Sequence, residues 1–340
     1  MKHRTWPRAS SSSPFSSFPF PTDTPSSSSP AKHNRFARRY SLRHPPPLPP
    51  APSDRAACFS ALPYDVMVKI AASFDDPTLK AASVVCRSWW EALRPLREAM
   101  LLLRWGKQFK HGSPQVRQNA EKALESFEKA AARGSALAMV DAGLMYWERG
   151  EKQRALDLFL KSAELGNHAA QCNLGISYLQ AEPPKTEEAI KWLQKASIGG
   201  NARAQYQLAL TLHRSCATKS NMKEAARWYL KAAEGGYVRA MYNISLCYSF
   251  GDGLTHSNQL ARKWMKRAAD RGHSKAQYEH GLALFSEGDN MKAVVYLELA
   301  TRAGERGASH VKNEALHRLS AALRDHAMHL ADTWRALPSK

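Results

Sequence analysis

The first 57 residues show no regular pattern of hydrophobic and polar positions. They contain a run of serines at 26–29 and a proline-rich run at 45–50, and almost no aliphatic pattern. A segment of this kind buries too little apolar surface to offset the entropy lost on folding. The sequence therefore predicts a disordered tail over residues 1–57.

A helical pattern begins at Phe59. Val66, Ile70 and Phe74 recur at the spacing of one helix face, and Pro95 limits the last helix of this segment. We expect three short helices within residues 58–97. Helices this short cannot bury all of their large apolar side chains among themselves, so part of the surface is expected to contact a partner.

Beyond residue 119 the pattern itself repeats, with a period of 32 to 36 residues. One glycine closes the first helix of each period: Gly134, Gly166, Gly200, Gly236, Gly272 and Gly304. An alanine lies eleven residues before each glycine and another lies four residues after it: Ala123, Ala155, Ala189, Ala225, Ala261, Ala293, and Ala138, Ala170, Ala204, Ala240, Ala276, Ala308. Small residues at these positions let two helices approach closely. The sequence predicts a solenoid of about six helix pairs over residues 119–309.

The segments on either side of the repeats are also expected to be helical. Residues 99–112 align with residues 240–253, so we interpret the segment 98–118 as a half repeat that connects the two parts. After the last repeat no glycine or proline occurs before Pro338, and apolar positions keep a helical spacing. We expect one long capping helix within residues 310–340, covering the last repeat. The expected fold class is all-α.

The three-helix segment resembles the F-box family. Leu62-Pro63, Ile70, Leu79 and Val85-Cys86-Arg87 followed by Trp89 match the F-box pattern, although Phe74 replaces the usual leucine. This resemblance implies docking onto the Skp adaptor of a cullin-type ubiquitin ligase. The expected adaptor-binding residues are Leu62, Pro63, Ile70, Leu79, Val84, Val85, Cys86 and Trp89. The alternative is an ordinary three-helix cap to the solenoid.

The repeats carry the composite motif A-x-x-W-x-x-K-A-A-x-x-G, which resembles the Sel-one-like repeat, a relative of the tetratricopeptide repeat. The resemblance implies a right-handed superhelix that binds proteins or peptides.

Basic residues recur on the first helix of the repeats. The candidate substrate-binding residues are Lys161, Lys191, Lys195, Arg227, Lys231, Lys263 and Arg267. Two interpretations are open. Glu164, Glu234 and Asp270 lie three residues after a base and neutralise a solvated face, or the bases form a stripe that captures an acidic or phosphorylated segment of a substrate.

The sequence offers little support for catalysis or metal binding. No nucleophile with a base, phosphate-binding glycine loop or supported acid pair is present, so we expect no catalytic residues and no cofactors. His326 and His329 lie one turn apart but lack a third ligand, so no metal site is expected. The five dispersed cysteines suit a reducing compartment. No apolar run is long enough to span a membrane.

The leading hypothesis is a substrate receptor of a Skp-cullin-F-box ubiquitin ligase in the cytoplasm or nucleus. The F-box would bind the Skp-type adaptor, and through it a cullin, while the solenoid would bind a protein substrate. One alternative is an organellar RNA-binding repeat protein, because the net charge is +19 and the tail resembles a transit peptide for a plastid or mitochondrion. Another is an F-box scaffold that does not promote degradation.

Overall fold

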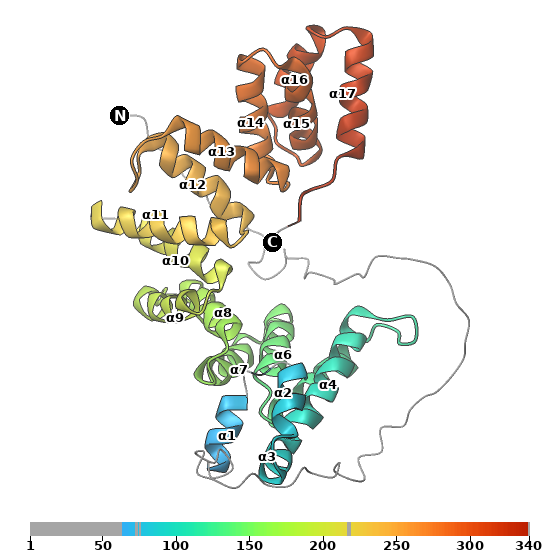
Figure 1. Cartoon of the computed structure of the whole chain (residues 1–340), viewed down its shortest axis with the longest axis vertical. Helices are drawn as coiled ribbons and strands as arrows, with labels where there is room; N and C mark the ends of the chain where they lie inside the picture. The colour runs from blue at the N-terminus through green and yellow to red at the C-terminus, as the bar shows by residue number, and fades with distance from the viewer. Residues whose placement is uncertain (1–62, 72–73, 75, 216–218, 339–340) are drawn as a thin grey trace. The chain divides into compact units, whose positions relative to one another are not determined.

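The computed structural model describes residues 63–71, 74, 76–215 and 219–338. Within these residues every regular element is a helix, and the expected all-α fold is confirmed (Figure 1). The tail predicted to be disordered, residues 1–57, lies outside the described part. No described helix combines the length and the apolar character needed to cross a membrane.

The chain divides into two compact units, Met1–Ala155 and Leu156–Lys340. The helices of the first unit are α1 Tyr64–Ala71, α2 Asp76–Ser83, α3 Arg87–Ala92, α4 Arg94–His111, α5 Ala120–Ala132 and α6 Ala136–Glu148. The division falls within α7 Lys152–Glu164. The second unit continues with α8 His168–Leu179, α9 Thr186–Ile198, α10 Ala202–Arg214, α11 Lys219–Glu234, α12 Val238–Phe250, α13 Asn258–Asp270, α14 Ser274–Ser286, α15 Asn290–Arg302, α16 Ala308–His317 and α17 Ala321–Thr333.

In the first unit, α1, α2 and α3 pack on the beginning of α4. Leu79 of α2, Trp89 of α3 and Leu96 of α4 share one buried cluster, and Phe74 packs against it. The phenyl ring at 74 is therefore accommodated where the F-box pattern usually has a leucine. The three short helices expected within residues 58–97 are present, and they share their core with α4.

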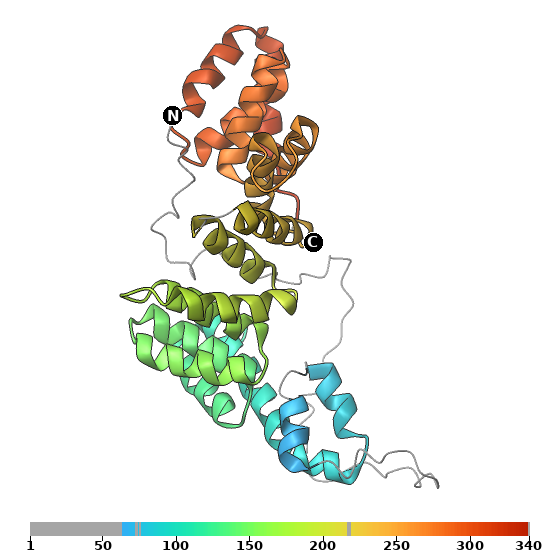
Figure 2. The same ribbon diagram turned by 90° about the vertical axis from the view of Figure 1, so that its left-hand side faces the viewer.

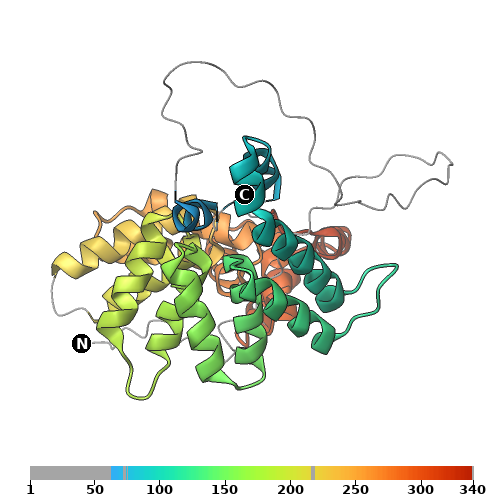
Figure 3. The same cartoon turned by 90° about the horizontal axis from the view of Figure 1, so that it is seen from below.

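Helix α4 also pairs with α5 through the rest of its length. The connection between them turns back at Gly112, and the two helices lie side by side (Figure 3). A methyl group in place of the Gly106 hydrogen would overlap the phenyl ring of Phe127. Gly106 therefore permits a close approach that a larger residue would block. α4 contacts the three short helices at one end and α5 at the other.

In the second unit, each even-numbered helix from α8 to α14 packs tightly against the odd-numbered helix that follows it. The pairs α8 with α9, α10 with α11, α12 with α13 and α14 with α15 make extensive contacts, and each odd-numbered helix from α9 to α13 also contacts the next even-numbered one. Even-numbered helices also contact each other directly, as α8 does α10 and α14 does α16. The even-numbered helices therefore form one side of the stack and the odd-numbered helices the other.

The small residues predicted to let the helices approach are buried. The twelve alanines that define the period are all in the core. The six glycines that end the first helices all have a backbone φ between 83° and 88°. Because this left-handed conformation is strained for residues with a Cβ atom, glycine is the residue that ends these helices at low cost.

The C-terminal cap differs from the sequence prediction. Instead of one long helix within residues 310–340, the chain forms α16 and α17, separated by a turn at Arg318–Ser320. The amide of Leu319 donates to the carbonyl of Leu316, which closes that turn. The break lets α17 fold back along α15 (Figure 2), where Ala327 and Leu319 pack with the buried Val294. Burial of this apolar surface outweighs the continuous helical pattern of the segment.

Candidate functional site

Two of the residues predicted to bind an adaptor belong to the core of the chain itself. Leu79 is 2% exposed and Trp89 is 8% exposed, both within the cluster formed with α4. In this structure both side chains support the surface from beneath, and a direct contact of either with the adaptor stays a prediction.

The other described members of the set reach the surface. Ile70 is 43% exposed, Val84 54% and Val85 62%, and Pro63 is also exposed. Val84 and Val85 stand in the tight turn after α2, where their amides donate to the carbonyls of Ala81 and Ala82. This turn holds two large apolar side chains in solvent. Burying them would lower the free energy, so the surface is suited to a protein partner.

The two remaining positions of the predicted adaptor-binding set are Cys86 and Leu62. Cys86 is half-buried at the start of α3 and packs against the core cluster. Leu62 lies outside the described residues. On the neighbouring side of α3, the guanidinium of Arg97 lies 3.9 Å from the ring centroid of Trp90, which braces α3 against α4. Burial lowers the pKa of Arg97.

The predicted basic stripe lies on the odd-numbered helices, and its members are exposed: Lys161, Lys191, Lys195, Arg227, Lys231, Lys263 and Arg267. We call it the odd-helix stripe. Three of its cations lie over the indole ring of the tryptophan three residues earlier. The distances to the ring centroids are 4.3 Å for Lys195 on Trp192, 4.5 Å for Lys231 on Trp228 and 4.8 Å for Arg267 on Trp264.

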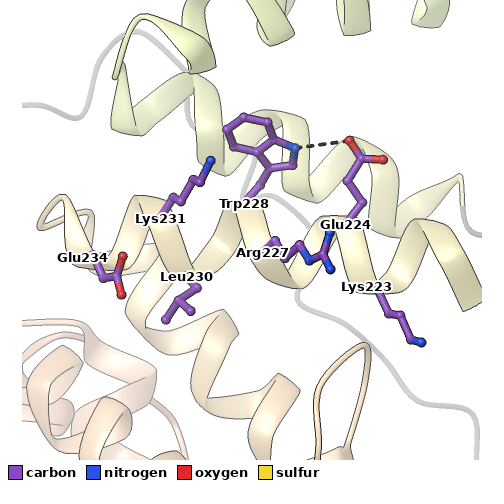
Figure 4. Close-up of a pocket in the computed structure, with 7 residues that line it drawn as sticks. All are labelled: Lys223, Glu224, Arg227, Trp228, Leu230, Lys231 and Glu234. Atoms are coloured by element: carbon purple, nitrogen blue, oxygen red, sulfur yellow. Dashed lines mark hydrogen bonds between the residues drawn. The ribbon is translucent and has the colours of Figure 1, made fainter.

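Figure 4 shows this arrangement on α11. The ammonium of Lys231 points to the ring of Trp228, whose Nε1 donates a hydrogen bond of 3.4 Å to Glu224. Arg227 and Lys223 of the same helix are among the residues that line a shallow pocket here. The Trp228 ring is thus contacted by both Lys231 and Glu224. Lys195, Lys231 and Arg267 each gain a stabilising cation–π contact in this way.

The acidic residues expected to neutralise the stripe do not do so. Asp270 pairs instead with Lys266 at 2.8 Å and accepts a hydrogen bond of 2.6 Å from Tyr296. In the described part of the chain, Lys195, Lys231 and Arg267 form no ion pair, whereas Lys191 pairs with Glu188 at 3.2 Å. Lys195, Lys231 and Arg267 are therefore held by aromatic rings rather than by carboxylates, and binding of a substrate by the stripe stays a prediction.

A second set of bases, on the even-numbered helices, was missed by the sequence analysis. Arg203, Arg239 and Lys275 occupy equivalent positions in α10, α12 and α14, and we call them the even-helix row. Arg239 and Lys275 are exposed and Arg203 is half-buried. The signal was present: each base directly precedes the alanine of its repeat, in the sequences RAQY, RAMY and KAQY, at intervals of 36 residues.

Aromatic residues stand between the bases of the even-helix row. Arg203 and Arg239 both lower the pKa of Tyr237, although burial is the larger effect and raises it to about 12. Arg239 and Lys275 likewise act on His273, whose pKa falls to about 4, chiefly through burial. Each ring therefore lies within the field of two bases that belong to successive repeats.

The described residues hold no group of three His, Cys, Asp or Glu side chains able to bind a metal ion. The arrangement is one of surfaces rather than of a reactive centre: an apolar patch at Ile70, Val84 and Val85, the odd-helix stripe, and the even-helix row. These surfaces are suited to binding other macromolecules.

Comparison with known proteins agrees with this description. Six segments match the Sel1 repeat family, at residues 102–135, 136–167, 168–201, 202–237, 238–273 and 274–305. F-box protein At1g70590 of Arabidopsis thaliana is 56% identical over 348 residues, which cover 99% of each chain. The chain therefore belongs to the Sel1 repeat family and is an F-box protein with six such repeats.

Solved structures show the same fold. A protective antigen of uropathogenic Escherichia coli aligns with a TM-score of 0.61 and 24% identity, over 78% of this chain. The chain spans about 59% of the length of that antigen. A Sel1 repeat protein of Oxalobacter formigenes aligns with a TM-score of 0.56 and 24% identity, over 64% of this chain and 94% of its own. At this identity the likeness concerns the fold alone.

Proposed function

We propose that the protein is a substrate receptor of a Skp-cullin-F-box ubiquitin ligase. Its F-box helices would bind a Skp-type adaptor, and through it a cullin, while its repeats bind the protein to be ubiquitinated. The chain itself would be non-catalytic, and it would act in the cytoplasm or nucleus. This proposal takes the F-box name of the Arabidopsis relative as its starting point.

The observation that carries the proposal is the apolar patch formed by Ile70, Val84 and Val85. Three large aliphatic side chains are 43% to 62% exposed on the three short helices and the turn after α2, whereas Met67, Leu79 and Trp89 of the same helices are buried. Several large aliphatic side chains exposed in one small unit are typical of a protein interface. The buried Leu79 and Trp89 hold the turn between α2 and α3 in place beneath it.

A charge introduced on this patch tests the proposal. Val85→Glu places a carboxylate on its most exposed residue and should abolish copurification of the adaptor and cullin. The matched control is Leu101→Glu, because Leu101 on α4 is similarly exposed, at 51%, and lies outside the F-box helices. Adaptor recovery that is equal in wild type and Val85→Glu would argue against the ligase assignment.

The odd-helix stripe is retained as one candidate contact for an acidic or phosphorylated substrate segment. Its support is that Lys195, Lys231 and Arg267 are exposed and unpaired with acids in the described part. If the stripe binds the substrate, changing all three to glutamate should make substrate recovery fall sharply while adaptor binding persists. Unchanged recovery at low salt would leave the stripe with a structural role only.

A further inference from the structure

We propose that the even-helix row of Arg203, Arg239 and Lys275, together with the apolar residues beside it, binds an extended anionic segment of the substrate. The inference rests on the proposed function only in taking the repeats as the substrate-binding part. It predicts that an anionic segment of the substrate binds to the even-numbered helices rather than to the odd-helix stripe.

The bases of the even-helix row form a continuous region of positive charge. Tyr237 lies in the field of Arg203 and Arg239, and His273 in the field of Arg239 and Lys275. The three bases therefore follow one another along successive helices. A ligand that lies across α10, α12 and α14 can meet all three, because these helices are joined in turn: the Tyr206 ring of α10 lies 4.9 Å from that of Tyr237 at the start of α12, and Tyr242 of α12 donates to Glu279 of α14.

The second argument is the lack of competing carboxylates around Arg239. In the described part of the chain neither Arg239 nor Lys275 forms an ion pair. Arg203 donates a hydrogen bond of 3.3 Å to the amide oxygen of Asn173, which is neutral. Two acids lie at the Lys275 end of the row, where Glu279 accepts a hydrogen bond from Tyr242 and Glu305 accepts one from Ser274. Negative charge is therefore best placed at Arg239, in the middle of the row.

The third argument is an apolar row beside the basic one. Leu210, Leu246 and Leu282 lie seven residues, or two helical turns, after the three bases, and all are partly exposed. Phe250, one turn further along α12, is 56% exposed. A segment that alternates acidic and apolar side chains would satisfy both rows at once.

The spacing of the helices fits an extended chain. Packed helices have axes about 8–10 Å apart, and a peptide in the extended polyproline II conformation advances about 3.1 Å per residue and brings every third side chain to the same face. Three residues of the peptide therefore cover about the distance between the axes of two neighbouring helices. The row should prefer a segment with an acidic or phosphorylated side chain at every third position.

Single-stranded RNA would also seek a row of bases and aromatic rings, but the rings here are already stacked. Tyr237 lies 4.9 Å from the ring of Tyr206, and His273 lies 4.6 Å from the ring of Tyr242. Base stacking requires an aromatic face that is open to the nucleotide. The arrangement therefore favours a peptide.

The test compares two matched double variants of the full chain. Arg203→Glu/Arg239→Glu reverses two bases of the even-helix row, on α10 and α12, and Lys195→Glu/Lys231→Glu reverses two bases of the odd-helix stripe, on the preceding helices α9 and α11. Binding is measured by fluorescence anisotropy with a labelled peptide of five Asp-Leu-Ser units, and with a second peptide that carries phosphoserine in place of aspartate. Thermal unfolding checks that both variants are folded, and the single variant Arg239→Glu, at an exposed residue, serves if the double variant is unstable.

At low salt we expect the even-helix variant to lose affinity about tenfold or more for at least one probe, and the odd-helix variant to lose less than about twofold. The inference is overturned if the odd-helix variant loses as much, if neither variant loses affinity, or if the wild-type chain binds neither probe. Equal affinity for a peptide of the same composition with its aspartates clustered at one end would overturn the extended register. Tighter binding of oligouridine that depends on Arg203 and Arg239 would replace the peptide by RNA. Adaptor copurification, measured on the same variants, reports separately on the proposed function.

Discussion

The hydroxyl of Tyr242 donates a hydrogen bond of 2.6 Å to Oε1 of Glu279, which lies 37 residues later in the chain. Burial is the largest effect on the pKa of Glu279 and raises it, while the hydrogen bond from Tyr242 acts in the opposite direction. The pair joins α12 to α14 and makes the stability of this part of the stack depend on pH.

The sign of that dependence follows from the raised pKa. The folded state holds the Glu279 proton more tightly than the unfolded state does, so ionisation of this residue lowers stability as the pH rises above about 4.5. Tyr242→Phe removes a hydrogen bond to the ionised form and should cost about 1–2 kcal/mol at pH 7.5, and less near pH 4. Urea unfolding at the two pH values measures this. Tyr278→Phe, at the equivalent position of the next repeat, is the control, and an equal loss at both pH values would contradict the assignment.

The cations over the tryptophans should contribute modestly to stability. Lys231→Gln removes the ammonium from the ring of Trp228 and should lower the free energy of unfolding by about 0.5 kcal/mol, the low end for an exposed cation–π contact. The control is Lys263→Gln, because Lys263 is an exposed base of the same stripe with no ring contact in the described structure. A loss of equal size in both variants would point to a general charge effect instead.

Substitutions of a buried and of an exposed F-box residue should have different effects on stability and on adaptor binding. Leu79→Ala leaves a cavity beneath α2 and should cost about 2–5 kcal/mol. Val84→Ala, at an exposed position, should change stability by less than about 0.5 kcal/mol but weaken adaptor binding. Thermal unfolding and adaptor titration on both variants provide the two readings. If Val84→Ala destabilises as much as Leu79→Ala, the exposed patch has been misassigned.

The close contact between α14 and α15 should not tolerate an added methyl group. A Cβ atom at Gly281 would lie 2.8 Å from Cγ of Leu297, which is fully buried. Gly281→Ala should therefore cost about 1–3 kcal/mol through overpacking, despite the higher helix propensity of alanine. Adding Leu297→Ala should recover part of that loss, so that the double variant is less destabilised than the sum of the two single variants. Strict additivity in denaturant unfolding would show that the two residues do not interact.

The buried thiols should be inert in the native protein. Burial raises the pKa of Cys172 to about 11 and that of Cys247 to about 12. Because the thiolate is the reactive form, both should resist iodoacetamide at pH 8 until the repeats unfold, whereas the half-buried Cys86 should react earlier. Mass spectrometry of timed samples measures the order. Rapid native modification of Cys172 would show that the repeat opens easily.

The periodic features of the fold were predictable from sequence, because small residues at fixed separations determine how closely helices pack. The buried alanines and the glycines with positive φ follow that logic. The burial of Leu79 and Trp89 was not predictable, because it depends on α4 completing the core of the three short helices. The turn at Arg318–Ser320 has no glycine or proline to mark it, and it forms because α17 gains contacts with α15.

The functional surfaces were predictable to different degrees. The bases of the odd-helix stripe were visible as a period, but their contact with tryptophan required knowledge of side-chain direction along each helix. The even-helix row was equally periodic and was overlooked, since its bases stand directly beside the small residues that drew attention to packing. Periodicity alone does not distinguish a stabilising position from a binding one.

Helix α4 contributes Leu96 to the core of the F-box helices and Gly106 to the contact with Phe127 of α5. Both contacts are faces of one continuous helix, so the angle between them depends on the number of residues that separate them. Each added residue would rotate one face by about 100° relative to the other and lengthen the helix by about 1.5 Å. Seven added residues would nearly restore the original angle while extending the helix by about 10 Å. In this protein the orientation of the F-box helices towards α5 is therefore a matter of helical phase, and evolution can change it only in steps of whole residues.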